Sequence, residues 1–375
     1  MIRGRVALSA VVILLLAACT AGPAPVPTTT PEPSSSAPVG ALVPVGEPKV
    51  LATGLRAPWS IVRLGAADST LISERDSGTV VERLPSGRLR DAGVVPGVVR
   101  TGEGGLLGLA ILQGGSTDRT TWLYAYLTTA TDNRIVRMPL AGASGSYRLG
   151  SATPILTGLA KAANHNGGRI AFGPDGMLYA TVGDAGQPSR AQDPASLNGK
   201  ILRMTETGAV PADNPSAGSL VYSLGHRNPQ GIAWDAEGQL WAAEFGQDTW
   251  DEFNRIEPGG DYGWPIVEGA GSKAGYIDPV YQWPTSDASP SGLAFIDGTF
   301  FLAALRGERV WAIYPGATAT MARPFLVNSL GRLRDAVPGP NGTLWLLTNN
   351  TDGRGSPTDG DDKLIEVRLD VSRAG

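Results

Sequence analysis

Histidine is scarce in this chain, and one of its two histidines lies where acid–base chemistry is feasible. His165 stands in KAANHNGGRIAFGPDG, residues 161–176, and Asp184 follows in VGDAG. The GPDG segment is typical of a tight turn between alternating strands, which would return Asp184 to the end of the sheet where His165 lies. A carboxylate there could orient the imidazole as a general base, and Gly167 and Gly168 would let the backbone approach a ligand. A purely structural hydrogen bond would use the same pair, and the sequence leaves both possibilities open.

A cation and an amide stand side by side in LGHRNPQGIAWD, residues 224–235. Arg227 and Asn228 precede Pro229, which favours extended backbone and would direct both side chains toward one place. Arg227 could stabilise an anion or a developing oxyanion, although a loop arginine more often forms a surface salt bridge. We interpret His226 as structural.

An oxygen-rich segment follows in EFGQDTWDEFNRIEPGGDYGWP, residues 244–265. It contains Asp248, Asp251, Glu252 and Asp261 among turn residues. Calcium prefers carboxylate and carbonyl oxygens in flexible loops, so the segment is a candidate calcium site. It lacks the spacing of an EF-hand, and a solvated acidic loop is the alternative.

Two arginines alternate in GRLRDAVPGPNGTLWLLTNN, residues 331–350. Because successive side chains of a strand point to opposite faces, Arg332 and Arg334 share one face. If that face lines a channel, two guanidinium groups would need anionic partners, and a polycarboxylate ligand would serve. If it faces outward, they are solvated charges.

A repeated phrase predicts the scaffold that would position these segments. Six copies of an apolar strand followed by a turn and a second alternating strand have their anchors at Leu71, Leu123, Leu178, Leu240, Phe300 and Leu344. No segment keeps a helical period for long. The pattern predicts an all-β fold, a six-bladed β-propeller with four-stranded blades, whose innermost strands line a channel and whose loops at one mouth carry the chemistry. A two-sheet sandwich is the alternative.

The N-terminal segment predicts export and anchoring. Residues 1–18 have the features of a lipoprotein signal peptide, with Arg3 and Arg5 before an apolar run that ends at Cys19. Cys19 would receive a diacylglycerol, although an ordinary cleaved signal or a retained transmembrane anchor would also fit. Residues 19–47 are rich in Pro, Ser and Thr and predict a disordered tether, which leaves 48–375 for the propeller. We therefore expect an extracytoplasmic protein, lipid-anchored to a bacterial cell membrane.

Charge and cysteine content exclude two further features. The formal net charge is −4 and no basic run occurs, which argues against nucleic acid as a partner. Cys19 is the only cysteine, so the chain cannot form an internal disulfide.

Five motifs in this order carry a family resemblance. They are GEGGLLGLAI (102–111), NHNGGRIAFGPDG with VGDAG, LGHRNPQG, FGQDTWDEFNRI with GGDYGWP, and GRLRDAVPGPNGTLWLLT. Together they resemble the soluble pyrroloquinoline quinone (PQQ)-dependent glucose and aldose sugar dehydrogenases, the glucose/sorbosone dehydrogenase family. The likeness runs from about residue 55 to 350. Each motif alone is weak, whereas five in order are specific.

The resemblance implies catalytic roles for three residues. His165 matches the base that removes the proton of the sugar C1 hydroxyl while hydride passes from C1 to the quinone, and Asp184 matches the carboxylate that supports this base. Arg227 matches a cofactor contact near the reacting quinone oxygen, and Asn228 a second cofactor contact.

The resemblance also implies sites for calcium and for the cofactor. Gly246 and Gln247, the latter in place of the family's proline, match the pair whose backbone carbonyls hold the calcium that also binds PQQ. Glu252 and the backbone of Tyr262 match a second calcium site.

Four further positions would surround PQQ if the resemblance holds. Arg332 and Arg334 match clamps on the PQQ carboxylates. Glu103 stands where relatives commonly carry glutamine over the cofactor, which would put an anion beside an anionic quinone. Asn349 stands where the glucose enzyme has aspartate.

The expected function is PQQ- and calcium-dependent oxidation of an aldose at C1 to a lactone, with electrons passed to an unidentified acceptor. Two alternatives come from other classes. One is a non-catalytic propeller that binds a sugar or a protein, since folds outlive functions. The other is a calcium-dependent lactone hydrolase on the same scaffold.

Overall fold

The computed structural model describes Met1 and residues 37–65, 69–114 and 119–373. The predicted signal peptide beyond Met1, the predicted acylation site Cys19 and most of the predicted tether lie outside the described residues. In the described ranges, no helix is long and apolar enough to span a bilayer.

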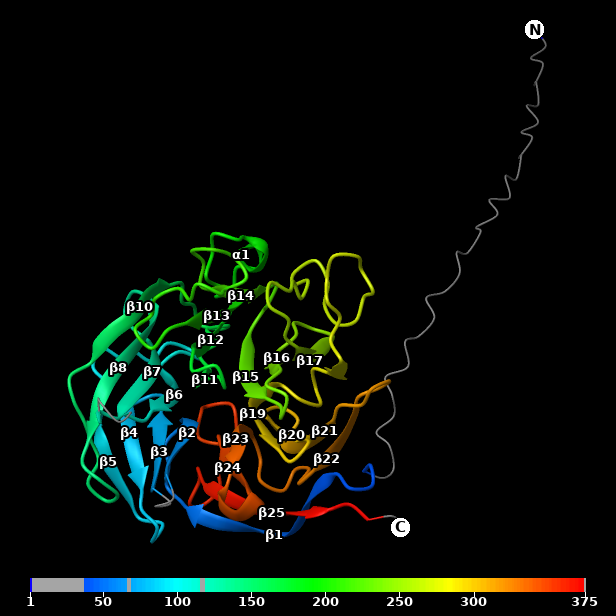
Figure 1. The fold of residues 1–375 in the computed structure, drawn as a ribbon. Coiled ribbons are helices and arrows are strands. Elements are labelled where there is room, and N and C mark those ends of the chain that lie inside the picture. Colours follow the sequence, from blue (N-terminus) through cyan, green and yellow to red (C-terminus); the bar gives the residue numbers. More distant parts are fainter. Residues whose placement is uncertain (2–36, 66–68, 115–118, 374–375) are drawn as a thin grey trace. The chain divides into compact units, whose positions relative to one another are not determined.

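Six antiparallel sheets form the blades of a propeller (Figure 1). Blade 1 consists of β2 (Pro58–Leu64), β3 (Ser69–Glu74), β4 (Thr79–Arg83) and β5 (Leu89–Val94). Blade 2 consists of β6 (Leu106–Leu112), β7 (Trp122–Thr128), β8 (Asn133–Ala141) and β10 (Thr153–Leu159). Blade 3 consists of β11 (Ile170–Phe172), β12 (Leu178–Val182), β13 (Lys200–Met204) and β14 (Val221–Leu224). Blade 4 consists of β15 (Pro229–Trp234), β16 (Leu240–Glu244), β17 (Trp250–Arg255) and β18 (Tyr281–Pro284). Blade 5 consists of β19 (Pro290–Ile296), β20 (Thr299–Ala304), β21 (Arg309–Tyr314) and β22 (Met321–Phe325). Blade 6 consists of β23 (Leu333–Pro338), β24 (Leu344–Thr348), β25 (Leu364–Val371) and β1 (Leu42–Ala52). A short strand, β9 (Arg148–Leu149), adds to β8. The predicted six-bladed β-propeller is confirmed.

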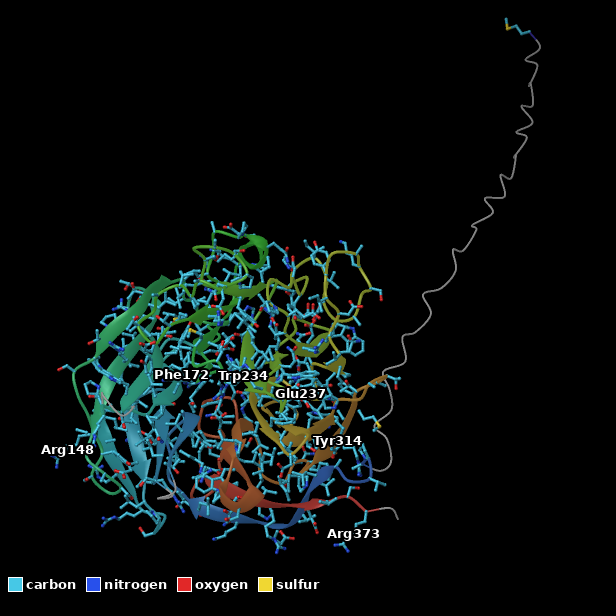
Figure 2. The ribbon with its side chains drawn as sticks, in the orientation of Figure 1. Arg148, Phe172, Trp234, Glu237, Tyr314 and Arg373 are labelled. Carbon is cyan, nitrogen blue, oxygen red and sulfur yellow. The ribbon has the colours of Figure 1, made fainter. Side chains whose placement is uncertain are left out.

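The repeat anchors lie in the second strand of each blade, in β3, β7, β12, β16, β20 and β24. These strands are almost wholly buried, because both of their faces pack against neighbouring blades. Leu71 of blade 1 packs in one cluster with Leu123 of blade 2, and Phe301 of blade 5 with Leu346 of blade 6. Figure 2 shows how densely side chains fill the blades. The apolar core therefore consists of layers between blades.

The N-terminal strand closes the ring, which corrects the expected domain boundary. Strand β1 pairs antiparallel with β25, with Leu42 opposite Val371, so the propeller begins before Pro48. The main chain of Leu42 also accepts a hydrogen bond from Tyr314 of blade 5 at 3.3 Å (Tyr314 is labelled in Figure 2). Residues 42–47 belong to the blade because their backbone completes its outer edge, which a Pro/Ser/Thr composition count does not detect.

Antiparallel pairing brings the candidate site residues to one end of the blades. The start of a first strand and the end of the second strand lie at the same end of a blade. The residues that lie in the loop before a first strand, at its start, or just after a second strand include Glu103, His165, Asp184, Arg227, Asn228, Arg332, Arg334 and Asn349. The fold therefore gathers them around one mouth of the channel.

Candidate active site

His165 and Asp184 form the hydrogen bond that the sequence predicts. The Nδ1 atom of His165 lies 2.8 Å from Oδ1 of Asp184, which is completely buried. The same carboxylate accepts the Gly186 N–H at Oδ1 and the indole N–H of Trp264 at Oδ2, 2.7 and 2.9 Å away. Because a carboxylate only accepts, Nδ1 carries the hydrogen and the lone pair of the imidazole is at Nε2. The imidazole is thus oriented as a base.

The loop that carries His165 is held in an uncommon conformation. His165 has φ +56°, in the left-handed region that costs a non-glycine residue about 1 kcal/mol or more. Its main-chain N–H donates to Glu103 at 3.1 Å, and the N–H of Gly167 donates to Asn228 Oδ1 at 3.0 Å. A Cβ at Gly183 would lie 2.2 Å from the carbonyl oxygen of His165, so only glycine fits there. Strained backbone held by several partners is a feature of functional sites.

The two glycines after Asn166 are needed for packing, and close approach of their backbone to a ligand stays a prediction. A Cβ at Gly167 would lie 2.6 Å from the carbonyl oxygen of Thr181, and one at Gly168 2.6 Å from the side chain of Leu107. Both also have positive φ. These glycines let the His165 loop pack against β12 and β6.

Arg227 is half-buried, and hydrogen bonds engage only part of its guanidinium group. Within the described structure, it does not form the surface salt bridge that is the alternative. Its guanidinium lies 5.5 Å from the ring centre of Trp264, and one nitrogen donates to the Phe245 carbonyl at 3.4 Å. Its Nε is buried without a hydrogen-bond partner among the described atoms. Burial lowers the pKa of Arg227, and the carboxylate of Asp184 is the first of several that oppose this shift. The guanidinium therefore has capacity for an anion.

His226 is structural, as the sequence indicates. Its ring is fully buried between Ser223 Oγ at 2.8 Å and Glu244 Oε2 at 2.7 Å, and it stacks on Tyr262. The second oxygen of Glu244 accepts the main-chain N–H groups of Arg227 and Asn228. This network fixes the turn into β15.

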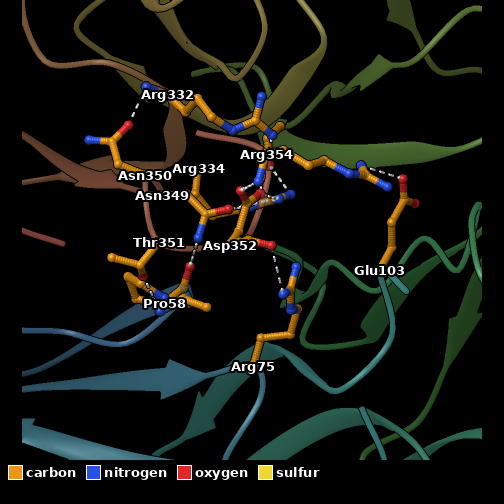
Figure 3. Close-up of polar contacts among 12 residues, drawn as sticks. Pro58, Arg75, Glu103, Arg332, Arg334, Asn349, Asn350, Thr351, Asp352 and Arg354 are labelled. Carbon is orange, nitrogen blue, oxygen red and sulfur yellow. Dashed lines mark hydrogen bonds and ion pairs between the residues drawn. The ribbon is translucent and has the colours of Figure 1, made fainter. Parts of the chain in front are cut away.

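An arginine-rich cavity of about 190 Å³ lies beside the His165 loop. Its lining residues are Trp59, Glu103, Gln230, Phe245, Ser289, Leu305, Arg306, Arg332, Arg334 and Arg354. Arg332 and Arg334 share this face of blade 6, which confirms their predicted orientation (Figure 3). His165 and Arg227 do not line the cavity themselves. His165 contacts the lining residue Glu103, and Arg227 contacts the lining residue Phe245.

The two channel arginines share one carboxylate, Asp352, that the sequence reasoning missed. Its Oδ2 lies 3.2 Å from Arg332 and 3.8 Å from Arg334 (Figure 3). Burial lowers the pKa of Arg334, and Nε of Arg332 is buried without a partner in the described structure. Asp352 follows the second strand of its blade, as Asp184 does in blade 3, and this recurrence is the signal that could have found it.

Asn349 and Glu103 contact arginines of the cavity. The side-chain oxygen of Asn349 accepts two bonds from Arg334, at 3.0 and 3.1 Å, and its amide donates to the Pro58 carbonyl. Glu103 pairs with Arg354 at 2.9 Å, a cation that the sequence reasoning also missed. Asn349 thus orients Arg334, and the charge of Glu103 is compensated.

The predicted acidic calcium cluster does not form. Asp251 is buried between the N–H groups of Gly246 and Ser289, while Asp261 accepts from Gln192 and Gly263. Across the described residues, no group of three or more His, Cys, Asp or Glu side chains is placed to hold a metal ion. The carboxylates separate because Asp251, Glu252 and Asp261 accept main-chain N–H groups at different places, whereas Asp248 accepts the side-chain amide of Gln247.

The loop of Gly246 and Gln247 instead presents carbonyl oxygens. Glu268 Oε1 accepts the N–H groups of Gln247, Asp248, Thr249 and Trp250, at 2.7 to 3.2 Å. The peptide bonds here are trans, so the carbonyls of Gly246 and Gln247 point away from Glu268. Glu268, which the sequence reasoning missed, therefore sets the direction of the two oxygens expected to bind calcium.

The other two residues expected to bind metal have partners within the protein. Glu252 accepts the N–H of Gly269 at 2.8 Å and the amide of Asn254 at 3.1 Å, and burial raises its pKa. The Tyr262 hydroxyl donates to the Arg255 carbonyl at 2.6 Å. The second calcium site stays a prediction.

Comparison with known proteins agrees with this arrangement. The family model for glucose/sorbosone dehydrogenases matches residues 55–357. The chain belongs to the glucose/sorbosone dehydrogenase family. Membership makes it an oxidoreductase, and it confirms the family that the five motifs indicate.

Two curated members of the glucose/sorbosone dehydrogenase family are similar to the chain. The aldose sugar dehydrogenase YliI of Escherichia coli is 30% identical over 81% of this chain and 90% of its own length. Quinoprotein glucose dehydrogenase B of Acinetobacter calcoaceticus is 32% identical, over 62% of this chain and 55% of its own. Among solved structures, the PQQ-bound aldose sugar dehydrogenase of Streptomyces coelicolor is 46% identical with a TM-score of 0.83, covering 90% of this chain and all of the other.

Proposed function

We propose that this protein is a PQQ- and calcium-dependent dehydrogenase that oxidises aldose sugars at C1 to lactones. The observation that carries the proposal is the arginine cavity, whose cations are only partly compensated, beside a histidine oriented as a base by a buried carboxylate. The PQQ-bound form of the similar Streptomyces coelicolor enzyme supports the choice of cofactor.

The residues of the cavity fit PQQ, which carries carboxylates and a quinone. Arg306, Arg332, Arg334 and Arg354 line the cavity, whereas Glu103 and Asp352 are the carboxylates in contact with them. The buried Nε of Arg332 also lacks a partner among the described atoms. An excess of guanidinium groups in a confined space favours a ligand with several carboxylates.

His165 would act as the general base. With Nδ1–H donated to Asp184, Nε2 can accept the proton of the sugar C1 hydroxyl. As the oxygen loses this proton, C1 loses hydride and the C1–O bond becomes the carbonyl of a lactone. Bound PQQ would supply the acceptor for that hydride. Arg227, with its unpaired Nε, would stabilise negative charge that develops on the acceptor side.

The carbonyl oxygens of Gly246 and Gln247 fit a calcium ion, which prefers oxygen donors. Glu268 holds the N–H groups of this loop on one side, so the two carbonyls point to the other side, where they could contact a cation. Calcium would hold the cofactor and withdraw electron density from it.

The cellular setting also belongs to the proposal. The signal-like segment before Cys19 supports export and acylation, which would anchor the enzyme to the outer face of a bacterial membrane. Electrons would then pass to an acceptor that reaches this face.

Reconstitution of the purified apoprotein tests the function. PQQ and calcium are added, PQQ binding is followed by absorbance, and sugar-dependent reduction of an artificial dye is measured. We expect His165→Ala to lower reduction by roughly 10² to 10⁴-fold and to leave PQQ binding intact, because a general base contributes about that much. Asn164→Ala, an exposed neighbour in the same loop, is the matched control and should behave as the wild type.

Two results would contradict the proposal. Failure to bind PQQ, together with no sugar-dependent reduction, would favour the non-catalytic binding propeller. Hydrolysis of a lactone in the absence of PQQ would favour the lactone hydrolase.

A further inference from the structure

We propose that Glu103 and Arg354 form an exchangeable ion pair in the arginine cavity, in which Glu103 stands in for a ligand carboxylate. When a ligand carboxylate displaces Glu103, Arg354 joins Arg332 and Arg334 in binding. The inference rests on the proposed function, because it takes the ligand to be a polycarboxylate such as PQQ.

The pair joins two blades across the cavity. Glu103 lies in the loop before β6 of blade 2, and Arg354 in the loop after β24 of blade 6 (Figure 3). Their side chains lie 2.9 Å apart and are 22% and 56% exposed, respectively. An ion pair with this exposure contributes little net stability, so a ligand anion can replace one partner at small cost.

Arg354 is placed by the same residue that holds the other channel arginines. Asp352 Oδ1 accepts the main-chain N–H of Arg354 at 2.9 Å, while its Oδ2 contacts Arg332 and Arg334. The backbone of Arg354 is therefore fixed beside the cavity, whereas its long side chain extends toward Glu103. A change of partner needs only rotation of that side chain.

Glu103 is fixed from the other side and would stay in place. Its second carboxylate oxygen accepts the N–H of His165, and its own N–H donates to the Ala163 carbonyl at 2.8 Å. Gly102 has φ +57°, and a Cβ there would lie 2.1 Å from the oxygen of Ala163, so glycine is needed for this approach. Exchange therefore moves Arg354 and leaves the base where it is.

The test is a double-mutant cycle with Glu103→Gln and Arg354→Gln. For each variant, calorimetry measures the dissociation constant of PQQ and, in a separate titration, that of benzene-1,3,5-tricarboxylate. Glutamine keeps an oxygen for the His165 N–H and removes only the charge. We expect Glu103→Gln to tighten binding by about fivefold, since no pair has to be broken. Arg354→Gln should change affinity by less than about twofold in the wild type, but weaken it by about fivefold in the Glu103→Gln background.

Arg306→Gln is the matched control, because Arg306 lines the same cavity and takes part in no ion pair among the described residues. It should weaken binding by the same factor in both backgrounds. Thermal unfolding of each variant checks that the fold is intact.

The outcomes separate the exchange from the function. Equal effects of Arg354→Gln in the two backgrounds, or weaker binding by Glu103→Gln, would overturn the exchange even if the enzyme is active with PQQ. The expected cycle with the tricarboxylate, but no PQQ binding, would support the exchange and contradict the proposed cofactor. If neither ligand binds the wild type, both ideas fail.

Discussion

Asp184 connects several residues of the site, because its two carboxylate oxygens accept hydrogen bonds from different partners. One oxygen accepts from His165 and the other from the indole of Trp264. Trp264 in turn lies under the guanidinium of Arg227, so one indole connects the carboxylate behind His165 with this cation. Trp264 is therefore a positioning residue, and its role depends on a contact between blades 3 and 4 that no local pattern reveals.

Asp184→Asn should remove most of the activity without removing the cofactor. Oδ1 of Asp184 accepts from Gly186 as well as His165, and Oδ2 accepts from the Trp264 indole, so an amide nitrogen at either position faces an N–H donor and disrupts the network. In the orientation that keeps an oxygen for Trp264, the amide nitrogen faces His165 and donates to Nδ1. The imidazole would then carry its hydrogen at Nε2 and could not accept the sugar proton. We expect the turnover rate to fall roughly 10²-fold or more, with the PQQ dissociation constant unchanged.

Trp264→Phe is the companion variant for this prediction. It removes one hydrogen bond to Asp184 but leaves the carboxylate in place, so it should cost less than Asp184→Asn. Full activity of Asp184→Asn would show that the pair is only structural.

At the scale of elements, the loops do more than connect strands, because several of them are shaped by a single carboxylate. Glu268 collects four successive N–H groups of the loop after β16, and Asp352 organises the loop after β24. A carboxylate that accepts several main-chain N–H groups fixes the opposite carbonyls as well, since the two groups of a trans peptide point in opposite directions. Such loops are rigid enough to present oxygens to an ion.

Glu268→Ala should weaken calcium binding. The carbonyls of Gly246 and Gln247 would lose the constraint that directs them, and loss of a charged acceptor costs about 1.5 to 3 kcal/mol. We expect the calcium dissociation constant, measured by calorimetry with PQQ present, to rise by about tenfold or more.

Asp278→Ala is the matched control for this prediction. Asp278 also accepts main-chain N–H groups, those of Gly271 and Ser272, but in another loop. Calcium binding should be unaffected. An unchanged calcium affinity in Glu268→Ala would refute the role of the loop.

At the scale of the whole molecule, the ring depends on pairing between the two ends of the described domain. Strand β1 is the outermost strand of blade 6, whose other strands come from the C-terminal part of the chain. Leu51 and Ala52 of β1 are buried against Trp345 and Leu347 of β24 and Ile61 of blade 1. Closure therefore links the first and last blades through apolar packing.

Deletion of residues 1–52 should destabilise the propeller, whereas deletion of 1–36 should not. The longer deletion removes β1 and exposes apolar side chains of blade 6. Loss of burial for about two aliphatic side chains costs about 3 kcal/mol or more of the free energy of unfolding. Urea unfolding followed by tryptophan fluorescence measures the difference. Equal midpoints for the two truncated proteins would show that β1 does not contribute to closure.

The sequence by itself determined the architecture and the pairing of His165 with Asp184, because both depend on short-range patterns. Six apolar strands with their turns are local features, and the position of Asp184 opposite His165 follows from one hairpin. Only the tertiary structure decided which distant residues complete the site. Asp352, Arg354, Glu268 and Trp264 reach it from other blades or long connections, and the acidic residues of 248–261 separate although they are close in sequence. The physical reason is that hydrogen-bond and charge partners are set by how the blades and their long loops pack, which brings together residues that are far apart in the chain and separates others that are close.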